Sequence, residues 1–136
     1  EKAIKIIEIN TASIDELMSL KGIGEFFAKN IIKKRTELGG FISKNQLMEV
    51  WKMDEEKYAL IENQISVDNA RIEKIDLNNA TAEQLKVHPY LSWNEANSIV
   101  KMRTQLGGFS KIEDIKRSVL IDEELFQKIK PYIIVK

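Results

Sequence analysis

The sequence predicts an all-α protein built from two tandem four-helix modules. Shifting the chain by 68 residues against itself aligns it without a gap, and 20 of the 68 aligned positions are identical. Helix start signals recur at corresponding places in both copies, and a glycine pair follows each long helical pattern. A gapless repeat of this length indicates two copies of one structural unit. We assign module 1 to residues 1–68 and module 2 to residues 69–136, joined by an ordered polar segment at 66–73.

The first two helices of each module are predicted from their end signals. A Ser-x-x-Glu or Thr-x-x-Gln pattern forms a capping box, in which side chains bind the free amides of the first turn, and it precedes a short Leu-containing stretch. Apolar residues at helical spacing then predict a longer helix, and Gly39 or Gly107 is placed to end it. The predicted helices span 13–20 and 25–38 in module 1, and 81–88 and 92–106 in module 2.

Two further helices complete each module. The Ser-x-x-Gln pattern at 43–46 and the Ser-x-x-Glu pattern at 110–113 predict the start of the third helix. The fourth starts at Asp54 or Asp122, whose carboxylate can cap it, while two following glutamates favour the positive end of the helix dipole. We interpret these acidic triplets as caps, because calcium loops need a longer alternating pattern with a glycine. Short loops join the helices, with no need for a sheet.

Composition excludes several classes of protein. With 43% apolar and 31% charged residues the chain is predicted to fold, and its formal net charge is zero. It has no apolar run long enough to span a bilayer, so we expect no direct membrane insertion by this segment. It has no cysteine, and His88 has no second His or Cys, so no metal site and no cofactor are expected. There is no nucleophile elbow and no Walker loop, and Gly22-Ile23-Gly24 lacks the third glycine of a dinucleotide fingerprint, which favours a protein that is not an enzyme.

The hairpin Lys21-Gly22-Ile23-Gly24 is the candidate binding site. Gly22 can take the left-handed conformation that closes the first helix, and Ile23 can turn inward as an apolar plug. Gly24 leaves backbone amides bare at the start of the next helix, where a phosphate can bind. The alternative is a turn that only reverses the chain. In module 2, Ser92 with Glu95 forms a capping box, so the corresponding hairpin is predicted to be closed to phosphate.

Basic residues follow this hairpin. Lys29 and Lys33 lie four residues apart on one face of the predicted helix, and with Lys21 they could line a track for a DNA backbone. Lys34 and Arg35 extend the run. The alternative is a solvated helix face without a ligand.

Bulky residues at the turns are expected to be structural. Trp51 and Trp93 fall at hairpins in different positions, and we expect them in the core as plugs, the alternative being exposed contacts. His88, beside Pro89, is expected to be a partly buried turn residue.

The stretch "INTASIDELMSLKGIGEFFAKNIIKKRTELGGF" resembles the helix-hairpin-helix module of ComEA-type competence proteins. The shared features are the Asn-Thr-Ala opening, the Gly-h-Gly turn, an Ala four residues after the second Gly, and Arg before a Gly-Gly-Phe turn. The resemblance implies that each module is a double helix-hairpin-helix (SAM-like, ComEA-like) domain. It implies four hairpins, at 21–24, 51–54, 89–92 and 119–122. The chain is also similar to tandem ComEA-like proteins of Bacteroidetes.

The resemblance implies a competence-type, non-sequence-specific interaction with double-stranded DNA, contacted through backbone phosphates. The residues carried over are Lys21, Gly22, Ile23, Gly24, Lys29 and Lys33. It also implies a cell-envelope or periplasmic location if a membrane anchor precedes residue 1, and a cytoplasmic one otherwise; composition does not determine the compartment.

A second function is a structural or protein-interaction module that keeps this fold without binding DNA, with a protein as its partner. Zero net charge, Glu25 beside the phosphate site and three hairpins without glycine favour it. The photosystem extrinsic subunit U is similar in fold and serves as a docking piece.

Overall fold

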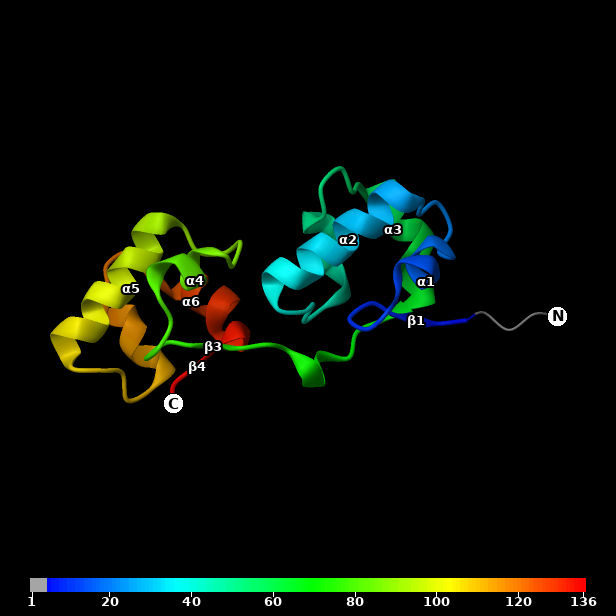
Figure 1. Cartoon of the computed structure of the whole chain (residues 1–136). Coiled ribbons are helices and arrows are strands. Elements are labelled where there is room, and N and C mark those ends of the chain that lie inside the picture. The colour runs from blue at the N-terminus through cyan, green and yellow to red at the C-terminus, as the bar shows by residue number, and fades with distance from the viewer. Residues whose placement is uncertain (1–4) are drawn as a thin grey trace. The chain divides into compact units, whose positions relative to one another are not determined.

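The computed structural model describes residues 5–136 and is mostly helical, as the sequence predicts (Figure 1). The contacts of the chain divide it between Ile72 and Glu73 into two compact units, here called module 1 and module 2. Both units share one order of elements, and the first unit ends with one further short helix. The repeat read from the sequence is therefore a repeat of structure.

Module 1 contains the predicted helices and two very short strands. α1 packs against α2, and α3 packs against the third helix, η1. η1 is a 3-10 helix, whereas the start signal was compatible with an α-helix. The elements are β1 (Ile7–Glu8), α1 (Ile14–Met18), α2 (Glu25–Leu38), η1 (Lys44–Glu49), α3 (Glu55–Ile61), η2 (Glu62–Gln64), β2 (Ile65–Ser66) and η3 (Asn69–Arg71).

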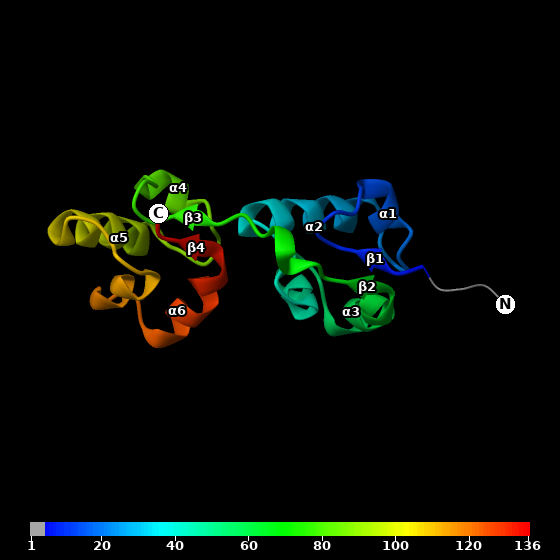
Figure 2. The ribbon, with the colours of Figure 1, turned by 90° about the horizontal axis from the view of Figure 1, so that it is seen from below.

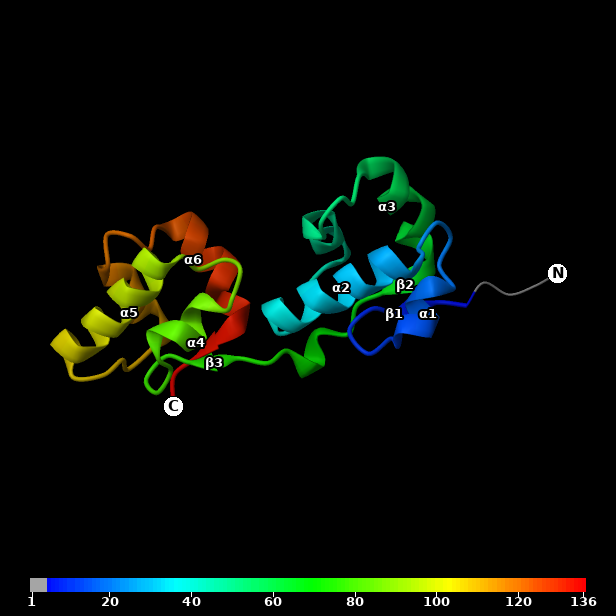
Figure 3. The ribbon, with the colours of Figure 1, turned by 45° about the horizontal axis from the view of Figure 1, so that its top comes forward.

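Module 2 repeats this arrangement with α4 packed against α5 and α6 against the 3-10 helix η4. Figure 3 shows the two sets of helices: α1, α2 and α3 in module 1, and α4, α5 and α6 in module 2. Within each module the short first helix packs against the long second helix. The elements are β3 (Ile75–Asp76), α4 (Ala82–Lys86), α5 (Trp93–Leu106), η4 (Ile112–Arg117), α6 (Glu123–Ile129), η5 (Lys130–Tyr132) and β4 (Ile133–Ile134).

Each module is closed by a two-residue parallel strand pair, which the sequence did not predict (Figure 2). Ile7 lies opposite Ile65, and Ile75 lies opposite Ile133. The expectation of modules without any sheet is wrong in this detail. Two residues are too few to show an alternating pattern, so the pairing depends on the fold bringing the two ends of each module together.

Most of the predicted helix ends are confirmed. Capping boxes begin α1 at Ser13, α4 at Thr81 and α5 at Ser92. Gly39 and Gly107 end α2 and α5 in the left-handed conformation, with φ of 87° and 70°. Glycine reaches this region without the steric penalty that a Cβ would add.

The predicted cap of the third helix in module 2 is wrong by one residue. Ser110 and Glu113 do not form it; instead the Asp114 carboxylate accepts from the amides of Ser110 and Lys111, at 2.8 and 3.2 Å. Lys111 and Asp114 align with Ser43 and Gln46 of module 1, where the capping box is present. The position of the cap is conserved between the copies, whereas the residue types are not.

A partly buried polar frame holds the start of each module against α2 or α5. Asn10 donates to the carbonyl of Phe41 at 2.9 Å and accepts from its amide at 2.7 Å. Arg35 Nη1 donates to the carbonyls of Ile9 and Ala12, at 3.0 and 2.8 Å. The corresponding residues of module 2 are Asn78 with Phe109, and Arg103 with Leu77 and Ala80. The Asn and Arg positions of the repeat are thus structural.

The segment that follows β2 contains the short helix η3 and is attached to module 1. The Asp68 carboxylate accepts from the Ala70 amide at 3.0 Å, and the Asp68 amide donates to Glu8 at 2.9 Å. The expectation of an ordered joint is confirmed for this stretch.

The prediction that both tryptophans lie in the core is wrong. Trp51 is 65% exposed and Trp93 is 47% exposed. The plug positions of the hairpins are filled instead by smaller side chains, such as Met53 and Ile121. A hairpin turn has room for one inward side chain, and the residues beside it face outward.

The described residues form neither a membrane-spanning helix nor a cluster of metal-ligating side chains. Between residues 5 and 136, no helix combines the length and apolar character that crossing a bilayer requires. Over the same residues, no three His, Cys, Asp or Glu side chains gather in a way that could hold a metal ion.

Candidate nucleic-acid interface

The first hairpin of module 1 has the conformation expected from its glycines. Gly22 has φ of +79°, in the left-handed region. Ile23 is buried, and its amide donates to the Leu20 carbonyl at 3.1 Å. Gly24 is the N-cap residue of α2. The chain therefore leaves α1, inserts one apolar plug and enters α2 within four residues.

The backbone conformation at Gly24 does not require a glycine. Its φ of −93° and ψ of −170° are open to any residue, and a Cβ built there would meet no atom within 4 Å. Any side chain would fit, and a Ser or Asp would cap the helix. At Gly24, however, no side chain accepts from the first-turn amides of α2. The missing side chain leaves these backbone donors without a capping acceptor.

The other three hairpins are capped by their own side chains. Asp54 accepts from the Lys57 amide at 2.7 Å, and Asp122 accepts from the Leu125 amide at 2.8 Å. Ser92 accepts from the Glu95 amide at 3.2 Å, completing the predicted capping box. Of the four hairpins, the one at Gly24 combines an uncapped start with a long helix behind it.

In module 2 the turn that aligns with the first hairpin is packed with rings. Tyr90 replaces Gly22, and its ring lies 4.9 Å from that of His88 and 6.1 Å from that of Tyr132. His88 is 2% exposed, so it is more buried than expected, and its Nδ1 accepts from the Tyr90 amide at 3.1 Å. This turn is stabilised by aromatic packing and offers no close approach to its backbone.

The second hairpin of module 1 has the geometry of the first without any glycine. Lys52 has φ of +66°, the single positive value among the described non-glycine residues. Met53 is buried, and Asp54 caps α3. Lys52 thus stands where Gly22 stands in the first hairpin, and it adds a charged side chain at the tip.

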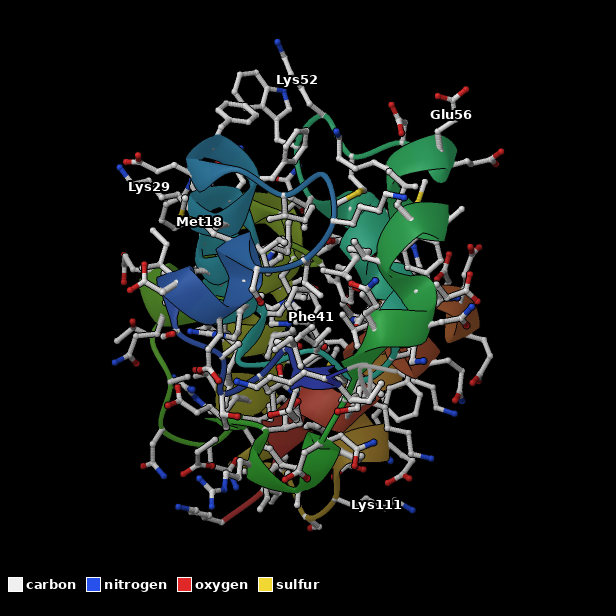
Figure 4. All side chains as sticks on the ribbon, turned by 90° about the vertical axis from the view of Figure 1, so that its right-hand side faces the viewer. Met18, Lys29, Phe41, Lys52, Glu56 and Lys111 are labelled. Atoms are coloured by element: carbon white, nitrogen blue, oxygen red, sulfur yellow. The ribbon has the colours of Figure 1, made fainter. Side chains whose placement is uncertain are left out.

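The predicted lysine track is only partly formed. Lys21 and Lys33 are exposed. Lys29 is paired with Glu25, with Nζ and Oε1 2.7 Å apart. Figure 4 shows Lys29 and Lys52 reaching outward from module 1 while Phe41 lies inside. Glu25 is therefore not a bare repulsive charge, and Lys29 is not a free cation.

Lys33 lies in a shallow groove beside α2. The groove has a volume of about 310 Å³ and contains both signs of charge. Its lining residues are Asn30, Lys33, Lys34, Glu37, Glu49 and Trp51.

Arg35 does not belong to the basic track. Its guanidinium binds two backbone carbonyls of the module, and burial lowers its pKa from the ordinary value. The run 33–35 therefore combines the exposed Lys33 and the half-buried Lys34 with an arginine that has a structural role.

Sequence reasoning missed three residues at this surface: Phe26, Trp51 and Lys52. Phe26 and Trp51 are exposed and in ring contact, with centroids 5.7 Å apart. The sequence contained one signal for Trp51 and Lys52. They align with Val119 and Leu120 in module 2. Different residues at matched turn tips indicate different partners.

Comparison with known proteins gives one family and several distant relatives. The family described as "Helix-hairpin-helix motif" matches residues 2–66 and again residues 70–134. Motifs of this kind commonly bind DNA without sequence preference.

The relatives are longer proteins. The chain is 27% identical to "Endonuclease/exonuclease/phosphatase family domain-containing protein 1" of Danio rerio, over 96% of this chain and 27% of that protein. The human protein of the same name is also 27% identical, over 91% of this chain and 27% of its own length. "Transcriptional accessory protein Tex" of Neisseria gonorrhoeae is 25% identical, over 86% of this chain and 15% of that protein. The chain thus spans about a quarter or less of these relatives. No solved structure matches it significantly.

Proposed function

We propose a function from the family, since this chain belongs to the helix-hairpin-helix motif family in both of its halves. The chain binds double-stranded DNA without sequence preference. The contact is made through the first hairpin of module 1. Backbone phosphate is the proposed ligand, held by the amides at the start of α2. Lys21, Gly22, Ile23 and Gly24 form the turn, and Lys29 and Lys33 lie along the helix that follows.

The observation that carries this proposal is the uncapped start of α2 at Gly24. A serine or aspartate fits there sterically and would stabilise the helix, yet the position has no side chain. Anions favour the start of a long helix because free amides and the helix dipole point at them. Backbone donors contact phosphate irrespective of base, so binding without sequence preference follows.

The finer assignment to the ComEA type, with a competence role, is part of the proposal and depends on the sequence resemblance. It is supported by the Gly-h-Gly turn and the Arg-Thr-x-Leu-Gly-Gly-Phe segment of module 1. The proposed role is binding without catalysis. The repeat boundaries proposed from the sequence are 1–68 and 69–136, and the division by contacts that defines the two modules lies a few residues later, between Ile72 and Glu73. With one open hairpin and zero net charge, we expect weak binding with a shallow salt dependence.

The test is an anisotropy titration of a labelled duplex with the whole chain at about 50 and 200 mM salt. Binding should weaken at the higher salt, and Gly24→Glu should abolish it while the far-UV circular dichroism stays unchanged. If the chain shows no salt-sensitive binding at either concentration, the proposal fails.

A second candidate function is protein docking by module 2. Apolar side chains at its turn tips are exposed, among them Trp93, Leu120 and Val119, which is 96% exposed. Their counterparts in module 1 are Glu25, Lys52 and Trp51. A pull-down with nuclease treatment discriminates the two functions, because partners that survive the nuclease favour docking.

A further inference from the structure

Module 1 has an aromatic patch beside the open hairpin, made of the exposed Phe26 and Trp51 and the half-buried Phe27. Trp51 is 65% and Phe26 is 47% exposed. The rings of Phe26 and Trp51 lie 5.7 Å apart, and those of Phe26 and Phe27 lie 5.2 Å apart edge to face. Phe26 is in the first turn of α2, next to the amides that Gly24 leaves open. The patch and the proposed phosphate site are therefore neighbours.

Two lysines stand against this patch. Lys52 Nζ lies 5.1 Å from the centre of the Trp51 ring, and Lys57 Nζ lies 4.5 Å from that of Phe27. Two acidic side chains beside the patch are engaged, since Glu25 is paired with Lys29 and Asp54 caps α3. The surface thus offers flat rings and positive charge together.

The groove of Lys33 continues this surface, because Trp51 lines both. Asn30 also lines the groove, and its buried Nδ2 has no hydrogen-bond acceptor among residues 5–136. Lys33 and Lys34 add positive charge there, against Glu37 and Glu49.

Module 2 shows that the fold does not need these features. The positions of Phe26, Trp51 and Lys52 are occupied there by Asn94, Val119 and Leu120, and the same helices form. The aromatic and basic residues of module 1 are thus additions to the repeat.

We propose that the aromatic patch binds unpaired bases, so that module 1 prefers DNA in which a duplex continues into a single strand. This inference rests on the proposed phosphate contact at the first hairpin. Bases inside a duplex are stacked on each other and present no ring face, whereas unpaired bases stack on exposed aromatic side chains. An apolar protein partner would cover the rings but leave Lys52 and Lys57 without a negative charge to pair with. A nucleic-acid strand supplies both, because its bases stack on the rings and its phosphates pair with the lysines.

The experiment compares two labelled DNAs with the whole chain: a blunt duplex of about 20 base pairs and the same duplex with a single-stranded extension of about eight nucleotides. We expect the extended DNA to bind tighter, by about 5- to 100-fold, as expected for one or two stacked bases. Trp51→Ala should remove this preference, so that the variant binds the two DNAs with equal affinity. Trp93→Ala, the matched control, should leave the preference intact.

Fluorescence provides a second readout, because the chain has two tryptophans. In the Trp93→Phe variant only Trp51 emits, and the extended DNA should quench it strongly while the blunt duplex does not. In the Trp51→Phe variant, Trp93 emission should not respond to either DNA.

The outcomes separate this inference from the proposed function. Equal affinity for both DNAs overturns the inference and leaves duplex binding standing. A preference that survives Trp51→Ala also overturns the inference. Tight, Trp51-dependent binding of the extended DNA without any binding of the blunt duplex supports the inference and contradicts the proposed duplex function. Binding of neither DNA overturns both.

Discussion

Glu25 Oε1 and Lys29 Nζ lie 2.7 Å apart, one helical turn from each other on the exposed side of α2. The hydrogen bond from Lys29, together with its charge, holds the pKa of Glu25 below its usual value. The pair joins the residue that would repel a phosphate to a residue that would attract one. The pair therefore adds no net charge at the open hairpin, and either partner can be changed by a single substitution.

Replacing Glu25 with glutamine should strengthen duplex binding. The substitution removes the carboxylate and frees Lys29, so affinity should rise by about 3- to 10-fold and the salt slope should steepen by up to about one unit. Anisotropy titrations over a salt series measure both quantities. The control is Glu113→Gln, the same charge change at an exposed position of module 2; an equal gain there would show a net-charge effect and contradict the site.

A serine at Gly24 should stabilise the fold and weaken DNA binding at once. Its hydroxyl can accept from the first-turn amides of α2, as Ser92 does in α5, and should add a few tenths of a kcal/mol to the free energy of unfolding. The same amides would no longer be available to phosphate. Denaturant titration and anisotropy measure the two effects, and a Gly24→Ser variant with unchanged affinity would exclude these amides as the contact.

Lys52→Asn should stabilise module 1 and reduce DNA affinity. Lysine at φ of +66° carries a steric cost of about 1 kcal/mol, which asparagine tolerates better. The loss of one positive charge should lower the salt slope by up to about one unit. Thermal unfolding and a salt series provide the measurements. Leu120→Asn, at the aligned position of module 2, is the control and should leave the salt slope unchanged.

Arg35→Met should destabilise the protein without changing its salt slope. The variant keeps the apolar stem but removes the donor to the carbonyls of Ile9 and Ala12, which should cost about 2 kcal/mol. Arg103→Met should behave similarly, because Arg103 makes the same two bonds in module 2. Urea unfolding measures the loss of stability, and anisotropy at equal folded fraction measures the salt slope. A lower salt slope in Arg35→Met would show that Arg35 contacts phosphate.

Acid should weaken module 2 through Asp76. Hydrogen bonds from Asn79, and from the amides of Asn78 and Lys136, lower the pKa of Asp76 in the folded protein. A carboxyl with a lowered folded pKa stabilises the protein above its unfolded pKa, and this contribution is lost as the pH falls through the folded value. The midpoint of thermal unfolding should therefore decrease as the pH falls below the usual aspartate pKa. In Asp76→Asn the midpoint should fall less over the same pH range. If it falls as much as in the unchanged protein, other carboxylates cause the effect.

Local signals predicted the helices because the responsible interactions are local. A capping box spans four residues and a glycine C-cap depends on one φ, so Ser13, Thr81 and Gly39 could be interpreted from the sequence. Asp114 was missed because its residue type differs from that at the aligned position. Weighing the 68-residue alignment above the local pattern would have placed this cap correctly.

The candidate site could be predicted only in part. The conformations of Gly22 and Ile23 follow from the turn motif, and the structure agrees with them. The exposure of Trp51 was only the alternative at the sequence level, because a tryptophan side chain is usually buried and the turn that exposes this one is set by the packing of the second hairpin. Whether a lysine is free or paired also depends on rotamers of neighbouring side chains, as Lys29 shows.

By itself, the sequence determined the all-α class, the two copies, the ends of most helices and the one hairpin that lacks a capping side chain. Each of these depends on residues close together in the chain or on the internal repeat. Tertiary structure alone decided that Arg35 binds backbone carbonyls, that short parallel strands close each module, and that Phe26 and Trp51 meet at the surface. The physical reason is distance along the chain: these contacts join residues some 23 to 58 positions apart, and only the packing of the helices brings them together.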